Sequence, residues 1–81
     1  MSERVMLKGY LADARKRYRE KDLEASGLLV AIRNLLNPYE EDMTLIDSEK
    51  ALIMMQRLNE CISDMKELKE KIAKLERELN G

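Results

Sequence analysis

The chain has 81 residues and a net charge of −1, and 38% of its residues are charged. A chain of this length is expected to form one small domain, residues 1–81, and such domains often need a partner or a covalent staple to be stable. There is no His, and the single Cys, Cys61, excludes an internal disulfide and leaves no ligand set for zinc. Because the common triads and the commonest general base require His, we expect a non-enzymatic protein with no metal, cofactor or small-molecule substrate.

Hydropathy along the chain predicts where the protein resides. The N-terminus lacks the apolar core of a signal peptide, and no apolar run approaches the ~20 residues of a membrane span. A single reduced cysteine fits a reducing compartment. We therefore expect a cytoplasmic protein that has no membrane as its partner.

Residues 2–36 are predicted to form the first helix, and Ser2 with Glu3 gives a weak start signal. Core-type residues are then spaced alternately by four and three: Leu7, Leu11, Ala14, Tyr18, Lys21, Ala25, Leu28, Ile32 and Leu35. Lys21 interrupts this apolar seam, so either its amine reaches solvent past a packed stem or the helices begin to splay there. Gly27 marks either a close approach of another helix or a weak point.

A connection is predicted at residues 37–46. Pro38 disfavours the helical conformation in the residue before it. Residues 40–42 form an acidic run without the spaced ligands of a calcium loop, so we expect a solvated connection. Thr44 with Asp47 resembles a capping box, whereas Asp47 itself or the next residue is an alternative cap for the second helix.

Residues 47–80 are predicted to form the second helix. Its seam has the same spacing: Ala51, Met54, Leu58, Cys61, Met65, Leu68, Ile72, Leu75 and Leu79. If the chain reverses near residue 43, each seam residue of the first helix faces a seam residue of the second helix. The residue numbers of such a pair sum to 86, as for Ala25 and Cys61. This agreement predicts an all-α antiparallel helical hairpin with coiled-coil packing and a buried, unreactive Cys61, and counts against one continuous helix in a long dimer.

Near the turn, apolar residues exceed two per heptad. The additional residues are Leu29, Leu36, Leu52, Ile53, Met55 and Ile62. A contact between two helices cannot cover so wide an apolar surface. We therefore expect these residues to form a self-association interface, in which two hairpins join as a homodimeric four-helix bundle. A partner protein that supplies the missing helices is the alternative.

A basic segment in the first helix suggests a second kind of partner. Its members are Arg15, Lys16, Arg17 and Arg19. Tyr10 and Tyr18 flank these charges, as in segments that contact nucleic acids. On a helix, however, the four charges do not form one stripe, and Asp13 and Glu20 dilute them. We therefore favour a solvated arm over contact with a polyanion.

The sequence thus predicts a small coiled-coil protein that acts through protein–protein interaction, as a structural, adaptor or chaperone-like module. In general architecture, a short charged helical hairpin resembles small accessory proteins of phages and prophages and chaperones of secretion systems. The alternative function is that of a nucleic-acid-associated accessory protein, encoded by a phage or prophage, which uses the basic segment.

Overall fold

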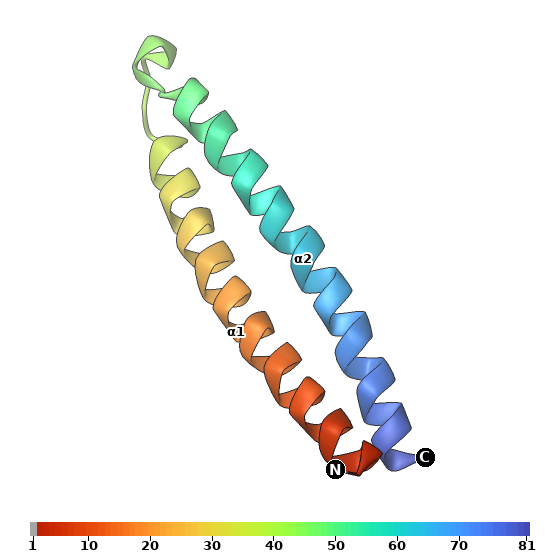
Figure 1. Ribbon diagram of the computed structural model, residues 1–81. Helices are drawn as coiled ribbons and strands as arrows, with labels where there is room; N and C mark the ends of the chain where they lie inside the picture. The colour runs from red at the N-terminus through yellow and green to blue at the C-terminus, as the bar shows by residue number, and fades with distance from the viewer. Residues whose placement is uncertain (1) are drawn as a thin grey trace.

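Two long antiparallel helices form the whole molecule in the computed structural model, which describes residues 2–81 (Figure 1). Helix α1 spans Glu3–Leu35, a 3₁₀ turn η1 spans Met43–Leu45, and helix α2 spans Ser48–Asn80. The hairpin is a rod of 62 × 17 × 17 Å, with both chain ends at the end away from the turn (Figure 1). The predicted all-α helical hairpin is confirmed.

Side-chain caps explain where both long helices begin. The Ser2 hydroxyl accepts a hydrogen bond from the Val5 backbone N–H at 3.3 Å, and Asp47 Oδ1 accepts one from the Lys50 backbone N–H at 3.0 Å. Each bond satisfies a backbone donor that has no partner within its helix. Of the two predicted starts of the second helix, the Asp47 cap is therefore correct and the capping box at Thr44 is wrong.

The turn is held by polar side chains that accept hydrogen bonds from the backbone N–H two residues further along the chain. Asn37 Oδ1 accepts from the Tyr39 N–H, and Glu40 Oε1 accepts from the Asp42 N–H. Asp42 Oδ1 in turn accepts from both the backbone N–H and the hydroxyl of Thr44, at 3.0 and 2.6 Å. The hydroxyl bond, and then the backbone bond, hold the pKa of Asp42 below its ordinary value. Part of the acidic run thus shapes the turn itself.

The core is a single seam between the helices, and every buried residue in the described chain is hydrophobic. All of the buried residues belong to the two predicted seams: Leu11, Ala14, Ala25, Leu28, Ile32, Ala51, Leu58, Cys61 and Leu75. All but Ala51 pack in two clusters, one around Leu28 and Leu58 near the turn and one around Leu11 and Leu75 near the chain ends. Lys21 lies between these clusters.

Lys21 keeps its place in the seam by reaching the surface. Its side chain is 38% exposed, and its Nζ lies 3.2 Å from Asp64 Oδ2 and 3.9 Å from Glu24 Oε2. The hydrogen bond and the charge of Asp64 raise the pKa of Lys21 above its ordinary value. The stem is thus largely covered while the ammonium group pairs outside, as the first of the two sequence interpretations expects.

Candidate interaction surface

One long side of the hairpin carries most of the residues that the sequence singles out. The residues that directly follow the seam residues share one side of a helix, because seven residues return nearly to the same direction and the two positions concerned in each heptad are neighbours four residues apart. We call this side the mixed face, and its charged and large hydrophobic residues are Lys8, Arg15, Arg19, Asp22, Leu29, Arg33 and Leu36 on α1 and Leu52, Met55, Ile62, Lys66, Lys69 and Glu76 on α2. Two observations place both helices on it: Leu29 and Ile62 line one groove, and Arg15 Nη2 pairs with Glu76 Oε1 at 2.9 Å.

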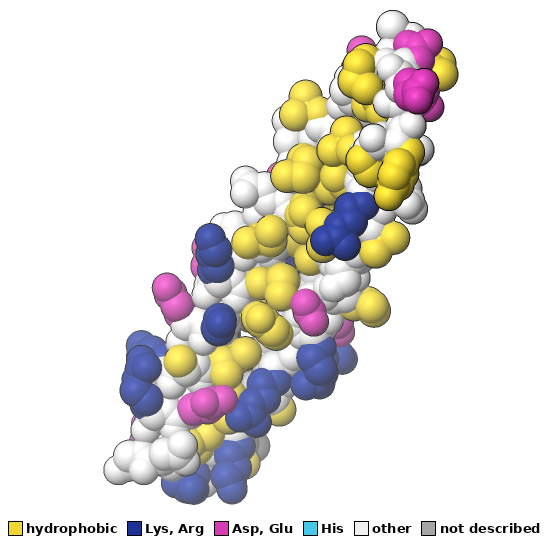
Figure 2. Space-filling model, turned by 180° about the vertical axis from the view of Figure 1, so that it is seen from behind, with side chains coloured by type: hydrophobic (Ala, Val, Ile, Leu, Met, Phe, Trp, Pro, Cys, Tyr) yellow, Lys and Arg dark blue, Asp and Glu magenta, His cyan; other side chains and the backbone are white. Residues whose placement is uncertain are grey.

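The mixed face is apolar in its half nearer the turn. Figure 2 shows hydrophobic side chains gathered over that half with a Lys or Arg side chain among them, most Lys and Arg together with some Asp and Glu over the half with the chain ends, and further Asp and Glu at the turn. Arg33 is the charged residue of the mixed face in the half nearer the turn. Between Leu29 and Ile62 lies a shallow groove of about 280 Å³, which is also lined by Ala25, Leu58 and Met65 and has Asp22 and Ser26 at its edge. The groove is therefore an apolar depression that a side chain of another molecule can enter.

The structure exposes all six residues of the predicted self-association interface. Their exposed fractions range from 39% for Ile62 to 62% for Leu52. Five of them lie on the mixed face, whereas Ile53, two residues beyond the buried Ala51, points away from it. Three further hydrophobic residues at the turn are at least 68% exposed, namely Tyr39, Met43 and Leu45. Sequence reasoning missed these three because a connection without periodicity gives no sign of which side chains are covered.

The basic segment of α1 is divided between different sides of the helix. Arg15 and Arg19 lie on the mixed face, Arg17 lies on the opposite side of the hairpin, and Lys16 points outward between them. Arg17 Nε pairs with Asp13 Oδ2 at 3.0 Å, and Arg15 pairs with Glu76 across the hairpin. Two of the four predicted polyanion contacts therefore already have an acidic neighbour.

A different basic patch forms where the two helices meet. The register places Arg15 and Lys69 at nearly the same height along the rod, and likewise Arg19 and Lys66, since each pair of residue numbers sums to nearly 86. All four side chains are exposed. The patch combines residues about fifty positions apart in the chain, so the sequence reveals it only once the register of the hairpin is applied.

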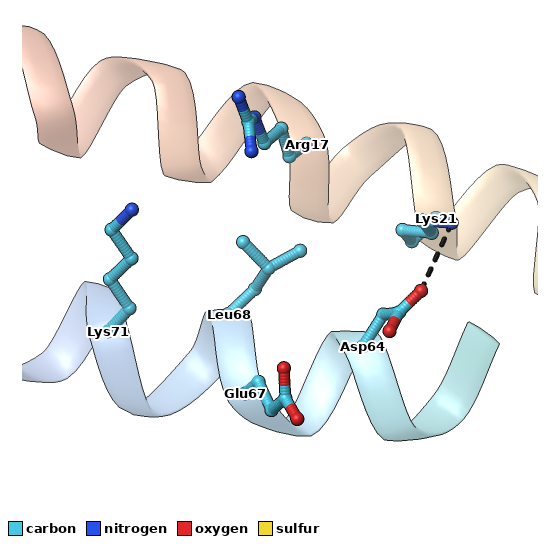
Figure 3. A pocket seen from close by; sticks show the side chains of 6 residues that line it. All are labelled: Arg17, Lys21, Asp64, Glu67, Leu68 and Lys71. Atoms are coloured by element: carbon cyan, nitrogen blue, oxygen red, sulfur yellow. Dashed lines mark ion pairs between the residues drawn. The ribbon is translucent and has the colours of Figure 1, made fainter. Parts of the chain in front are cut away.

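On the side opposite the mixed face, charged side chains of the two helices pair with one another. Figure 3 shows a shallow cavity there, of about 330 Å³, lined by Arg17, Lys21, Asp64, Glu67, Leu68 and Lys71. Lys21 and Asp64 pair across it, and Arg57 Nη2 lies 3.7 Å from Glu24 Oε1 nearby. Such bridges between helices favour this register, although exposed pairs contribute little free energy each. Within residues 2–81, no group of three or more Cys, Asp or Glu side chains is placed to hold a metal ion.

Cys61 is buried in the seam at 3% exposure, as predicted. Burial, and after it the neighbouring Glu24, raise the pKa of the Cys61 thiol above its ordinary value. A buried thiol with a raised pKa is protonated at neutral pH and is a poor nucleophile. Cys61 therefore acts as a small core residue.

Comparisons with known proteins add no relative to this description. No known protein family, no curated protein and no solved structure matches the chain. Neither of the two described long helices combines the length and the apolar character needed to cross a membrane.

Proposed function

We propose that this protein is a non-enzymatic interaction module that self-associates through the apolar half of the mixed face. Exposed Leu29, Leu36, Leu52, Met55 and Ile62, gathered on one side around a groove, are the observation that supports the proposal. A contiguous apolar patch of several hundred Å² on a small protein marks an interaction site or invites aggregation. Covering ~500 Å² of it is worth on the order of 10 kcal/mol before the costs of ordering are subtracted.

The occupant that fits this face best is a second copy of the hairpin. Two hairpins that meet through their apolar halves form a four-helix bundle, in which each supplies the helix pair that the other lacks. A small domain with a core only one seam wide gains much of its stability from such association. The resulting coiled-coil dimer would then serve as a structural, adaptor or chaperone-like unit.

Sedimentation equilibrium from about 1 to 100 µM tests the proposal. We expect the wild-type protein to have twice the mass of the 9.5 kDa chain. The double variant Leu29→Glu/Ile62→Glu should weaken dimerisation by about 100-fold or more, because two carboxylates would have to be buried in an apolar contact. Circular dichroism on the variant verifies that it remains helical.

Leu23→Glu is the matched control. Leu23 is 77% exposed but lies two residues before the buried Ala25, on the outer side of α1. The same change from Leu to Glu at this position should leave the dimer intact. A wild-type chain that is monomeric over the whole concentration range, or a control that dissociates as readily as the double variant, would overturn the proposal.

A further inference from the structure

The charge of the molecule differs between the two ends of the mixed face. Its half near the chain ends carries five basic residues against two acidic ones: Lys8, Arg15, Arg19, Lys66 and Lys69 against Asp22 and Glu76. Glu76 is already paired with Arg15. At the other end of the molecule, the turn carries Glu40, Glu41 and Asp42. A mainly apolar patch, whose one charged residue is Arg33, therefore lies between a basic half-face and an acidic tip.

We propose that two copies pair through the mixed face with their long axes antiparallel, which is the head-to-tail orientation, so that the acidic turn of each lies on the basic half of the other. This inference rests on the proposed self-association and specifies its geometry. The two copies are related by a two-fold axis that passes through the middle of the apolar half, perpendicular to the long axis of the hairpin. In such an isologous contact, every favourable pair of groups occurs twice.

Helical geometry places the apolar groups of the two copies in register. Leu36 and Ile62 mark the two ends of the apolar half, and they lie about 18 Å apart along the rod at about 1.5 Å per residue. A two-fold axis midway between them brings Leu36 of one copy onto the groove between Leu29 and Ile62 of the other. The groove, about 280 Å³, is an apolar site for that Leu side chain.

The same axis brings opposite charges together. A 33-residue helix is about 50 Å long and the molecule is 62 Å long, so the turn extends about 12 Å beyond the helix ends. The turn thus lies roughly 10–20 Å from the axis on one side. Arg19, Lys66 and Lys69 lie about 15–20 Å from the axis on the other side. The acidic turn of each copy therefore lies over the basic patch of the other.

The parallel arrangement places like charges together. With both turns at the same end, Glu40, Glu41 and Asp42 of the two copies would meet, as would their basic patches, and such contacts repel. The head-to-tail overlap is also large enough for a stable dimer. About 40 Å of overlap along a face 17 Å wide covers roughly 700 Å² per copy, close to the ~800 Å² per partner of a standard interface.

Charge reversal tests this geometry in the full chain. Arg19→Glu/Lys66→Glu and Glu40→Lys/Glu41→Lys should each weaken homodimerisation by about tenfold or more, because each places like charges against one another twice. An equimolar mixture of the two variants should recover wild-type affinity as a heterodimer, since both contacts again join opposite charges. The wild-type dissociation constant should rise with added salt. Circular dichroism verifies that each variant remains helical.

The control Lys8→Glu/Lys74→Glu makes the same change in net charge as the first variant. Lys8 lies on the mixed face but nearer the chain end than the overlap, and Lys74 lies on another side of α2, so this variant should dimerise like the wild type. A dimer whose affinity is unchanged by both reversals within the overlap would overturn the head-to-tail geometry and leave self-association standing. A wild-type monomer would overturn both.

A cysteine at the turn tests the orientation independently of charge. In the Cys61→Ala background, Met43→Cys places a thiol at the 68% exposed tip. Head-to-tail pairing holds the two tips about 40 Å apart, so oxidation of the dimer should give no more intermolecular disulfide than dilute monomer does. Rapid cross-linking of the dimer through this residue would overturn the proposal.

Discussion

At the scale of single residues, the middle of the hairpin holds two groups that make its stability depend on pH. The pKa of Cys61 is raised above its ordinary value of 9.0, chiefly by burial, and that of Lys21 is raised above 10.5, chiefly by Asp64. In both cases the folded chain keeps a proton that the unfolded chain releases more readily. Each contribution to stability is therefore complete below the unfolded pKa and is lost as the pH rises toward and through the folded pKa.

We therefore expect the melting temperature to fall as the pH is raised from 8 to 11, with the first decline just above pH 9.0, where the Cys61 thiol ionises in the unfolded chain. Thermal unfolding followed by circular dichroism measures this. Cys61→Ala should melt lower at pH 8, because it leaves a small cavity, but should lose less stability between pH 9 and 10. An equal decline in the variant would show that Cys61 is not the cause.

At the scale of the helices, Gly27 is a weak point of α1. No heavy atom lies within 4 Å of a Cβ placed at Gly27, so no other helix approaches it closely within the hairpin. Gly27→Ala should stabilise the hairpin by about 1 kcal/mol, because Ala loses less backbone entropy in a helix. This corresponds to a rise of about 4–8 °C in melting temperature.

Gly9→Ala is the comparison for this prediction. Gly9 is equally open but lies two turns from the start of α1, where the helix frays more readily. Its substitution should therefore raise the melting temperature by less than that of Gly27. A fall in melting temperature for Gly27→Ala would show that another molecule packs against this position in the assembled protein.

The helices show which parts of the structure are encoded locally. Both seams follow from spacing alone, because packing one helix along another selects residues every three and four positions. The start of α2 does not follow from the sequence alone, because Thr44 and Asp47 are both capping residues and only the path of the turn decides between them. The 3₁₀ turn depends likewise on side-chain bonds, such as that of Asp42, that compete with regular structure.

The candidate surface was predictable in the same partial way. Excess apolar residues such as Leu29 and Ile62 are visible in the heptads, but the same count includes Ile53, which lies on another side of α2. Separating these positions requires the direction of each side chain about the helix axis, beyond a count of apolar residues per heptad. The patch that joins Arg19 to Lys66 requires the pairing of both helices as well.

At the scale of the whole molecule, the contacts between helices differ widely in how much chain they enclose. Glu24 pairs with Arg57 near the middle, Arg15 pairs with Glu76 across 61 positions, and Arg4 Nη1 donates to the Leu79 carbonyl oxygen across 75. Closing a longer loop costs more entropy, so the layers near the turn form at lower cost than those near the chain ends.

Amide hydrogen exchange should follow this gradient. We expect faster exchange in the first turns of α1 and the last turns of α2 than around Leu28 and Leu58, because local opening begins where loop closure is most costly. Measurement by mass spectrometry at low protein concentration separates this effect from protection by the dimer. Uniform protection along both helices would contradict it.

The position of both chain ends at one end of the rod also decides how the molecule responds to force. Tension applied between Ser2 and Gly81 acts across the last layer of the seam, so the helices would peel apart one layer at a time from that end (Figure 1). Tension applied between the turn and the chain ends would instead act along the helix axes. The same hairpin is therefore mechanically weak when force is applied through its termini and stiff when force is applied along its long axis.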